Sequence, residues 1–381
     1  MQMSIVIAPD SFKGSLTSAQ VAEAMAKGVT RVLPQADLTL VPLSDGGEGL
    51  VDSLVVASGG RLLEFAVTGP LGTPVTAKMG LMGDGQTAVI EMAQASGLIL
   101  VPENERNPLV TTTYGTGELI KKALELGCNH LIIGIGGSAT NDGGMGMAQA
   151  LGFRFFDDQG EPLGPGGGEL ARLARIDASD KDPRLADVQI EVACDVNNPL
   201  TGPQGAAHIY GPQKGATPEM VEFLDAALAR YDRILQSDLG QDVGKVPGAG
   251  AAGGLGAGLM ALLEGRLVSG IELVLDVLDF DKKTKGSNLV LTGEGKFDAQ
   301  SAFGKVPMGV AHRARALGVP VVVVAGSVLP SAEILHGEGV TAYFSILNQP
   351  MSLDDAMING AQLIEHQVAE VVRLFSAVNE K

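Results

Sequence analysis

The chain has 381 residues, 45% of them hydrophobic, so it can bury a large core, and its length suggests roughly two domains. A formal net charge of −17 argues against binding to DNA, RNA or anionic lipid, because such binding needs many lysines and arginines to neutralise phosphates. Two cysteines without a CxxC pair, no HExxH motif and no apolar run near ~18 residues argue against a disulfide scaffold, structural zinc and a membrane span, and predict a cytoplasmic protein.

The N-terminal segment is predicted to alternate strands and helices. An apolar strand over residues 4–8 precedes a helix over residues 17–33, in which Thr17 and Gln20 form a capping box. Residues 38–42 then read as a second strand. This order is typical of the beginning of a βαβ arrangement.

The middle of the chain has a different character. Residues 61–92 are β-rich, and Gly83-Asp84-Gly85 joins the last two of these segments as a hairpin signal. The elements expected next are a helix over 116–126, a strand over 130–135, a long glycine loop, a helix over 145–151, a turn-rich stretch over 157–183 and an apolar run over 188–194.

The βα alternation returns near the C-terminus. The expected elements are a strand over 289–292, a helix over 305–317, strands over 320–325 and 342–347, and one last helix over 353–378 capped by Ser352. Parallel strands with crossover helices explain this order most simply. Because the two ends of the chain share this style, we predict a doubly wound domain from residues 1–65 and 285–381, interrupted by a domain from residues 66–284. A ligand would then lie between the domains, at the carboxyl ends of strands.

Glycine-rich turns follow several of these strands and carry hydroxyl, amide, carboxylate and lysine side chains. Glycine lets the backbone approach a ligand and exposes N–H groups that bind anions. Any one of them is equally consistent with a tight turn, but together they favour a nucleotide. The five turns are PDSFKGSL (9–16), SDGGEG (44–49), GIGGSATNDGGMG (134–146), GAGAAGGLG (248–256) and TGEGKFDAQSAFGKVP (292–307).

An acidic protein that binds a small anion must supply positive charge locally. The lysines that lie beside glycines are Lys13, Lys214, Lys296 and Lys305. Phosphoryl transfer also needs Mg²⁺ on carboxylates and a group that accepts the proton of the attacking hydroxyl. The carboxylates in these turns are Asp10, Asp45, Asp142, Asp195 and Asp298.

Asp195 is the predicted proton acceptor, because it follows the apolar run over 188–194 and so lies at a strand end. Asn197 is placed to hold its carboxylate by a hydrogen bond. A purely structural Asx turn at this position stays open as the alternative. Residues 136–142 are expected to form a main-chain and hydroxyl cradle for a substrate anion.

Two other functions remain as alternatives. No GxxxxGK[ST] motif occurs, which excludes an ordinary P-loop kinase. Gly134, Gly136 and Ala139 weakly match a dinucleotide fingerprint, with Asp157 or Asp158 downstream, although residues 140–144 separate these glycines from the next helix. A nicotinamide-dependent oxidoreductase acting on a small hydroxy acid and a non-catalytic nucleotide sensor are therefore the competing readings.

Seven motifs resemble, in this order, those of the class I glycerate kinases (glycerate 2-kinases) of bacteria: PDSFKGSL, DGGEG, GIGGSATNDGG, ACDVNNPL, GPQKGA, PGAGAAGGLG and TGEGKFDAQS. The resemblance covers essentially the whole chain. It implies phosphorylation of D-glycerate on its 2-hydroxyl by ATP with Mg²⁺, giving 2-phosphoglycerate. It also implies an α/β fold of two domains, a flavodoxin-like (Rossmann-like) doubly wound parallel-sheet domain and a smaller inserted α/β domain, with the active site in the cleft between them.

We assign catalytic roles to Asp195, Lys13 and Lys214, and a Mg²⁺ ligand role to Asp298. The expected partners are small molecules, and the chain is expected to be a monomer or a homodimer. Relatives are expected to carry arginine at Lys296 and often histidine at Phe303. The groups expected to bind substrate or phosphate are Asp10, Ser11, Asp45, Gly46, Gly47, Gly136, Gly137, Ser138, Asn141, Asp142, Asn197, Gly293, Glu294, Gly295, Lys296 and Lys305.

Overall fold

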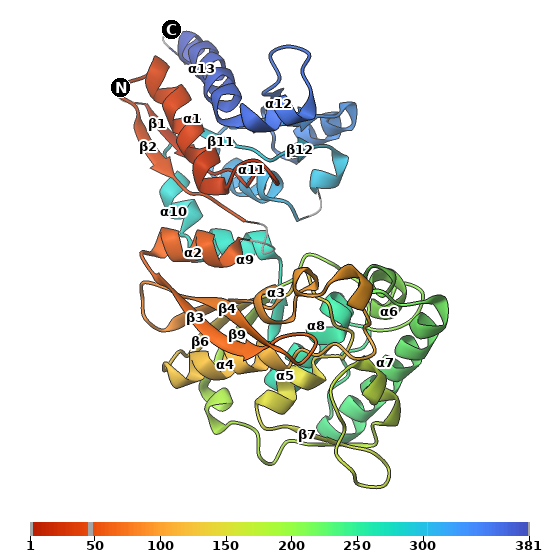
Figure 1. Cartoon of the computed structure of the whole chain (residues 1–381). Helices are drawn as coiled ribbons and strands as arrows, with labels where there is room; N and C mark the ends of the chain where they lie inside the picture. The colour runs from red at the N-terminus through yellow and green to blue at the C-terminus, as the bar shows by residue number, and fades with distance from the viewer. Residues whose placement is uncertain (1–2, 45–48, 303, 380–381) are drawn as a thin grey trace. The chain divides into compact units, whose positions relative to one another are not determined.

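The computed structural model describes residues 3–44, 49–302 and 304–379 (Figure 1). The chain divides into two compact units. The first unit comprises Met1–Asp45 and Ile271–Lys381, and the second unit comprises Gly46–Gly270. Within the described ranges, no helix is long and apolar enough to cross a lipid bilayer.

The first unit is built on a parallel five-stranded sheet, as the alternation of strands and helices predicts. In spatial order its strands are β2 (Asp37–Leu40), β1 (Ser4–Ile7), β11 (Leu289–Thr292), β13 (Val321–Ala325) and β15 (Ala342–Ser345). Numbered within this sheet alone, the order is 2-1-3-4-5, which is the flavodoxin order. The strand order reverses between β1 and β11, where such sheets bind ligands.

Helices α1 (Ser18–Val32) and α13 (Gly360–Asn379) lie side by side in this unit (Figure 1). The capping box predicted for α1 is present, with the Thr17 hydroxyl accepting from the Gln20 N–H. Val21 and Met25 pack with Ile364 and Val368 in the apolar core between these helices and the sheet. The remaining helices of the unit are α9 (Gly270–Val277), α10 (Phe280–Thr284), α11 (Val306–Ala316) and α12 (Leu353–Ile358).

The single C-terminal helix expected over residues 353–378 is wrong, because the helix is broken after Ile358. The Ser15 hydroxyl donates to the Met357 carbonyl oxygen (2.7 Å) in the last turn of α12. Gly360 follows, a residue with low helix propensity. As a result α12 and α13 are separate helices, and the loop after β1 lies against their junction.

The second unit is built on a mixed six-stranded sheet. The spatial order is β3 (Arg61–Thr68), β4 (Pro74–Leu81), β5 (Thr87–Glu91), β6 (His130–Gly134), β9 (Gln189–Ala193) and β10 (Arg266–Val268). The β3–β4 and β4–β5 pairs are antiparallel, which confirms the predicted hairpin, and the pairs from β5 to β10 are parallel. A small β7–β8 ribbon (Arg154–Phe156 and Arg175–Asp177) stands apart from this sheet.

Helices cover this sheet, and several of them have no counterpart among the expected elements. Those without a counterpart are α2 (Leu50–Ser58), α3 (Ala93–Ser96), α6 (Ala206–Tyr210), α7 (Pro218–Leu239) and α8 (Ala251–Leu263), whereas α4 (Tyr114–Glu125) and α5 (Met145–Ala150) match the helices expected over 116–126 and 145–151. The N-terminus of the long helix α7 could have been predicted from the sequence, because Thr217 is its N-cap residue and Pro218 is its first residue.

The unit boundaries differ from the expected domain boundaries at residues 65/66 and 284/285. The Val51 N–H donates to the Glu91 carboxylate on β5 (3.0 Å), and β3 pairs with β4 along its whole length, so α2 and β3 belong to the second unit. Arg313 on α11 forms ion pairs with Glu272, Asp276 and Asp281, which ties α9 and α10 to the first unit.

We predict that Gly28→Ala destabilises the first unit. A Cβ atom at Gly28 would lie 2.6 Å from the Glu365 carbonyl oxygen and 2.9 Å from the Val368 Cβ, so α1 and α13 would have to separate. Overpacking costs about 1–3 kcal/mol, which exceeds the ~1 kcal/mol that alanine adds to a helix.

The measurement is the shift of the thermal unfolding midpoint against Gly337→Ala, because a Cβ at Gly337 meets no atom within 4 Å. Equal midpoints for the two variants would show that the α1–α13 contact tolerates the extra methyl group.

Candidate functional site

The loops after β1 and β11 meet at the switch point of the first sheet. The Asp10 N–H donates to the Gly293 carbonyl oxygen (2.9 Å). A Cβ atom at Gly295 would lie 3.8 Å from the backbone nitrogen of Lys13. A cavity of about 630 Å³ opens here. The predicted site residues that line it are Asp10, Ser11, Lys13, Glu294, Gly295, Lys296 and Lys305.

Glu294 is the most buried carboxylate of this cavity, with 5% of its surface exposed. Burial raises the pKa of its carboxyl group, against hydrogen bonding from Ser301 and the charge of Lys305. The Ser301 hydroxyl donates to one carboxylate oxygen, and Lys305 Nζ lies 3.1 Å from the other. The three side chains form a connected polar group that fixes Lys305 at the cavity wall.

The other two lysines of the cavity differ in their partners. Lys296 Nζ pairs with the Asp298 carboxylate at 3.0 Å, and Asp298 is not among the lining residues. Lys13 is exposed and makes no ion pair with any residue in the described ranges. Lys13 is therefore a cation available to a ligand.

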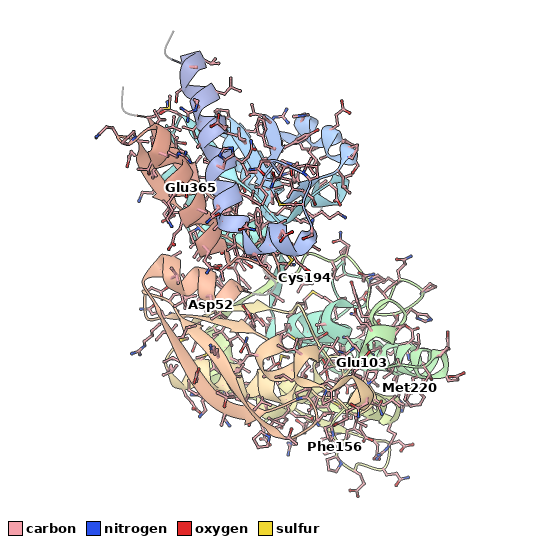
Figure 2. All side chains as sticks on the ribbon, turned by 45° about the horizontal axis from the view of Figure 1, so that its top comes forward. Asp52, Glu103, Phe156, Cys194, Met220 and Glu365 are labelled. Atoms are coloured by element: carbon pink, nitrogen blue, oxygen red, sulfur yellow. The ribbon has the colours of Figure 1, made fainter. Side chains whose placement is uncertain are left out.

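In the second unit, the loops after β6, β9 and β10 gather at the carboxyl edge of the parallel strands. Cys194, labelled in Figure 2, follows the last residue of β9, and Asp195 is the next residue in the sequence. Its Oδ1 accepts from the Ser269 hydroxyl (3.0 Å) and from the Gly270 N–H (2.9 Å), both just after β10. The side chain is exposed, so the fold holds an accessible carboxylate at this edge.

The partners of Asp195 include two residues that the sequence reasoning missed, Ser269 and Gly270. A hydroxyl residue directly after a short strand was the available signal. Asn197 is exposed, whereas the neighbouring Asn198 is anchored: its Nδ2 donates to the Gln204 carbonyl oxygen and its Oδ1 accepts from the Tyr210 hydroxyl (2.6 Å).

The loop over residues 136–142 is only partly accessible. Gly136 and Gly137 are exposed, whereas only 7% of the surface of Ser138 is exposed to solvent. The Leu98 N–H donates to the Gly137 carbonyl oxygen (2.8 Å), which holds the loop against the neighbouring chain segment. A ligand can reach the first three residues of the predicted cradle.

Asn141 and Asp142 are fully buried, so direct contact of these two side chains with a ligand is not supported. The Asp142 carboxylate accepts from the N–H and hydroxyl of Thr113 and from the N–H groups of Gly144 and Gly146. Burial raises its pKa, against these hydrogen bonds. Asp142 therefore shapes the loop from inside.

Lys214 is also internal, with 1% of its surface exposed. Its Nζ donates to Ser138 Oγ and to the Thr140 carbonyl oxygen, both at 2.7 Å. Burial lowers the pKa of Lys214 to about 7, and the charge of Asp142 acts in the opposite direction. Lys214 touches the loop and not the surface, so its role is to position Ser138.

The glycine-rich segment over residues 248–256, expected to be a ligand loop, is packed inside the second unit as the start of α8. A Cβ at Gly253 would lie 2.0 Å from the Thr140 carbonyl oxygen, so its glycines allow one backbone to contact another. Asp45, Gly46, Gly47 and Phe303 lie outside the described residues.

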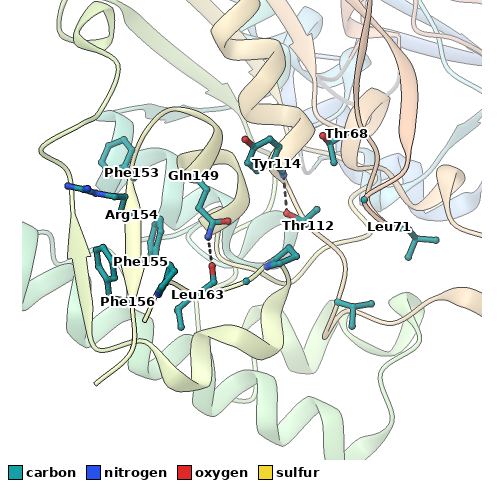
Figure 3. Close-up of a pocket in the computed structure, with 15 residues that line it drawn as sticks. Thr68, Leu71, Thr112, Tyr114, Gln149, Phe153, Arg154, Phe155, Phe156 and Leu163 are labelled. Atoms are coloured by element: carbon teal, nitrogen blue, oxygen red, sulfur yellow. Dashed lines mark hydrogen bonds between the residues drawn. The ribbon is translucent and has the colours of Figure 1, made fainter. Parts of the chain in front are cut away.

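The second unit has a cavity of its own, of about 560 Å³, shown in Figure 3. Aromatic side chains including Tyr114, Phe153 and Phe156 line it, and the Gln149 amide donates to the Leu163 carbonyl oxygen (3.1 Å) at its edge. None of the expected site residues lines it. The predicted site residues within the described ranges therefore lie elsewhere in the structure.

The sequence profile described as the Glycerate kinase family matches residues 5–376. The chain belongs to the glycerate kinase family. The glycerate kinase of Halalkalibacterium halodurans is 52% identical over 376 residues, covering 99% of each chain. The glycerate 2-kinase of Escherichia coli K12 is 52% identical over 354 residues, covering 93% of each chain.

A solved structure agrees with this family assignment. The crystal structure of a protein assigned as glycerate kinase 2 from Salmonella typhimurium LT2 superposes with a TM-score of 0.92 at 48% identity, covering 100% of both chains. These comparisons give no support to the oxidoreductase alternative. The structure agrees, because α5 begins only at Met145, well after the glycines that follow β6.

We predict that Lys214 makes the free energy of unfolding rise with pH between about 7 and 10.5. The pKa of Lys214 is about 7 in the folded chain and 10.5 ordinarily. Between these values the unfolded chain binds a proton that the folded chain has released, so stability rises with pH in this window.

The test compares urea unfolding of the wild type and of Lys214→Met at about pH 7 and about pH 9.5. The variant should lose part of the rise that the wild type shows. Parallel pH dependences would mean that Lys214 titrates at its ordinary pKa.

Proposed function

We propose that this protein is an ATP-dependent kinase that phosphorylates D-glycerate on its 2-hydroxyl, giving 2-phosphoglycerate and ADP. The observation that carries the proposal is the relationship to the E. coli glycerate 2-kinase, at 52% identity over nearly the whole of both chains. The structure supports the proposal in both units. In the first unit, lysines and Glu294 line a cavity at the carboxyl edge of the sheet. In the second unit, the Asp195 carboxylate is held by a hydrogen bond at the carboxyl edge of the parallel strands.

Mg²⁺ is part of this proposal, because phosphoryl transfer normally uses it to neutralise charge on the phosphates. Within the described ranges no group of three His, Cys, Asp or Glu residues is placed to hold a metal. Magnesium in kinases is commonly held by one or two carboxylates together with phosphate oxygens. Asp10 lines the cavity and Asp298 does not, so we favour Asp10 over Asp298 as its ligand.

Asp195 is proposed as the group that accepts the proton of the attacking hydroxyl. Its Oδ1 is fixed by Ser269 and Gly270, which holds the carboxylate in one orientation at the strand end. A general base needs this fixed placement before its pKa matters. The exposed Gly136 and Gly137 offer backbone groups at the same edge, in the loop that follows the neighbouring strand β6.

We predict that Asp195→Asn lowers kcat by ~10² to 10⁴, the usual contribution of a positioned base. The asparagine Oδ1 can still accept from Ser269 and Gly270, so the fold of the loop is kept. The measurement is ADP formation with D-glycerate, together with the affinity for ATP.

An unchanged kcat would remove Asp195 from the mechanism. Loss of ATP affinity together with kcat would instead make it part of the nucleotide and metal site. ADP formation that does not need D-glycerate, or an NADH signal, would contradict the proposed kinase function itself.

We predict that Lys214→Met lowers kcat/KM at least about tenfold, equal to ~1.4 kcal/mol of transition-state stabilisation. Without the ammonium group, Ser138 Oγ and the Thr140 carbonyl oxygen lose their shared donor, and the accessible part of the loop shifts. Lys121→Met is the matched control, since Lys121 is an exposed lysine of the same unit. Equal kcat/KM values in both variants would reduce Lys214 to a core residue without influence on the site.

A further inference from the structure

The residues that line the cavity at the switch point of the first unit fall into two chemically different groups, which we call its polar wall and its apolar wall. One wall carries the lysines and carboxylates described above. The other is apolar and comes from the loop after β15 and from α12: Ile346, Leu347, Met351, Leu353 and Met357. The loop after β1 connects the two walls, because it carries Lys13 and because the Ser15 hydroxyl bonds to the Met357 carbonyl oxygen.

Two aliphatic side chains of the apolar wall are open to solvent. Leu347 is 43% exposed and Leu353 is 74% exposed, although both line a cavity. Exposed apolar side chains gathered in a concave place, rimmed by charged residues, are typical of ligand sites. A flat, apolar group bound there would remove them from water.

The polar wall has a preferred end for anions. Helix α11 begins there, with Lys305 as its N-cap residue and no side-chain cap hydrogen bond. In contrast, the N-terminus of α1 is closed by the side chains of Thr17 and Gln20. The charge of Lys305 is balanced by Glu294, so the exposed Lys13 adds the positive charge to a cavity that also holds this uncapped helix N-terminus, a combination that favours phosphate groups.

We propose that this cavity is the nucleotide site: the adenine and ribose lie on the apolar wall, and the phosphates lie toward Lys13 and Lys305. The assignment rests on the proposed kinase function and adds which substrate the first unit binds. Glycerate does not fit this description, because it is small and polar and has no surface to cover Leu347 and Leu353. The cavity volume, about 630 Å³, falls in the range of sites for drug-sized ligands.

The test measures binding of adenosine and of ADP to the whole chain by calorimetry. In the double variant Leu347→Ser/Leu353→Ser, both ligands should bind about tenfold more weakly or worse, because two apolar contacts are lost. The matched control is Ile334→Ser/Ile358→Ser, whose side chains are 68% and 81% exposed in the same unit and do not line the cavity. It should bind both ligands like the wild type.

The variant Lys13→Met tests the polar wall separately from the apolar wall. It should weaken ADP binding and leave adenosine binding unchanged, because adenosine has no phosphate. Equal loss of ADP and adenosine in this variant would overturn the proposed orientation.

Unchanged ADP binding in the Leu347/Leu353 double variant, or loss of D-glycerate binding instead, would overturn the nucleotide assignment. If the wild type binds ADP in the expected way but does not phosphorylate D-glycerate, the proposed function fails while the nucleotide site stands.

Discussion

Backbone-to-backbone contact between two glycine-rich segments holds the second unit's site together. Gly253 lies so close to the Thr140 carbonyl oxygen that no side chain fits between them, and its own carbonyl oxygen accepts from the Gly143 N–H (3.1 Å). This contact buries the end of the loop after β6. Asp142 and Lys214 pair with some of the polar groups that this burial removes from water, whereas the Asn141 side-chain amide is buried without a hydrogen-bond partner among the described residues. What remains accessible is Gly136 and Gly137, with a small part of Ser138.

Both units place their chemistry by the same rule. In parallel strands every carboxyl end lies at one edge, so loops that are distant in sequence converge there. Asp10 and Gly293 meet in this way although most of the chain separates them, and Asp195 is bound by residues that follow β10. Rigid strands fix where each loop begins, and short loops carry the reactive side chains. The long chain segments between these loops form the helices that bury the sheets.

The sequence predicted the regular parts well because their signals are local. The apolar run before Asp195 and the Thr17–Gln20 box each show in a few adjacent residues, and both are present in the structure. The accessibility of site residues depends on distant packing, so Lys214 and Asp142 looked like ligand contacts although they are buried. The end of α12 after Ile358 likewise lies against Ser15, from the other end of the chain. The sequence also could not predict which charged residues form ion pairs, as Lys296 does with Asp298, and which face the cavity without one, as Lys13 does in the described ranges, because this depends on three-dimensional contacts.

The first unit is discontinuous, and this affects how the chain is made. β1 is an interior strand, fully buried at Ile5, Val6 and Ile7, and one of its two neighbours, β11, begins only at Leu289. During synthesis the second unit, which is continuous in sequence, is complete while β1 still has an unpaired edge. Long-range pairing of this kind is slow and leaves apolar strand edges open to other chains. The nascent protein is therefore most vulnerable to aggregation before the ribosome reaches β11, and shielding of its N-terminal strand by a chaperone has the greatest effect in that interval.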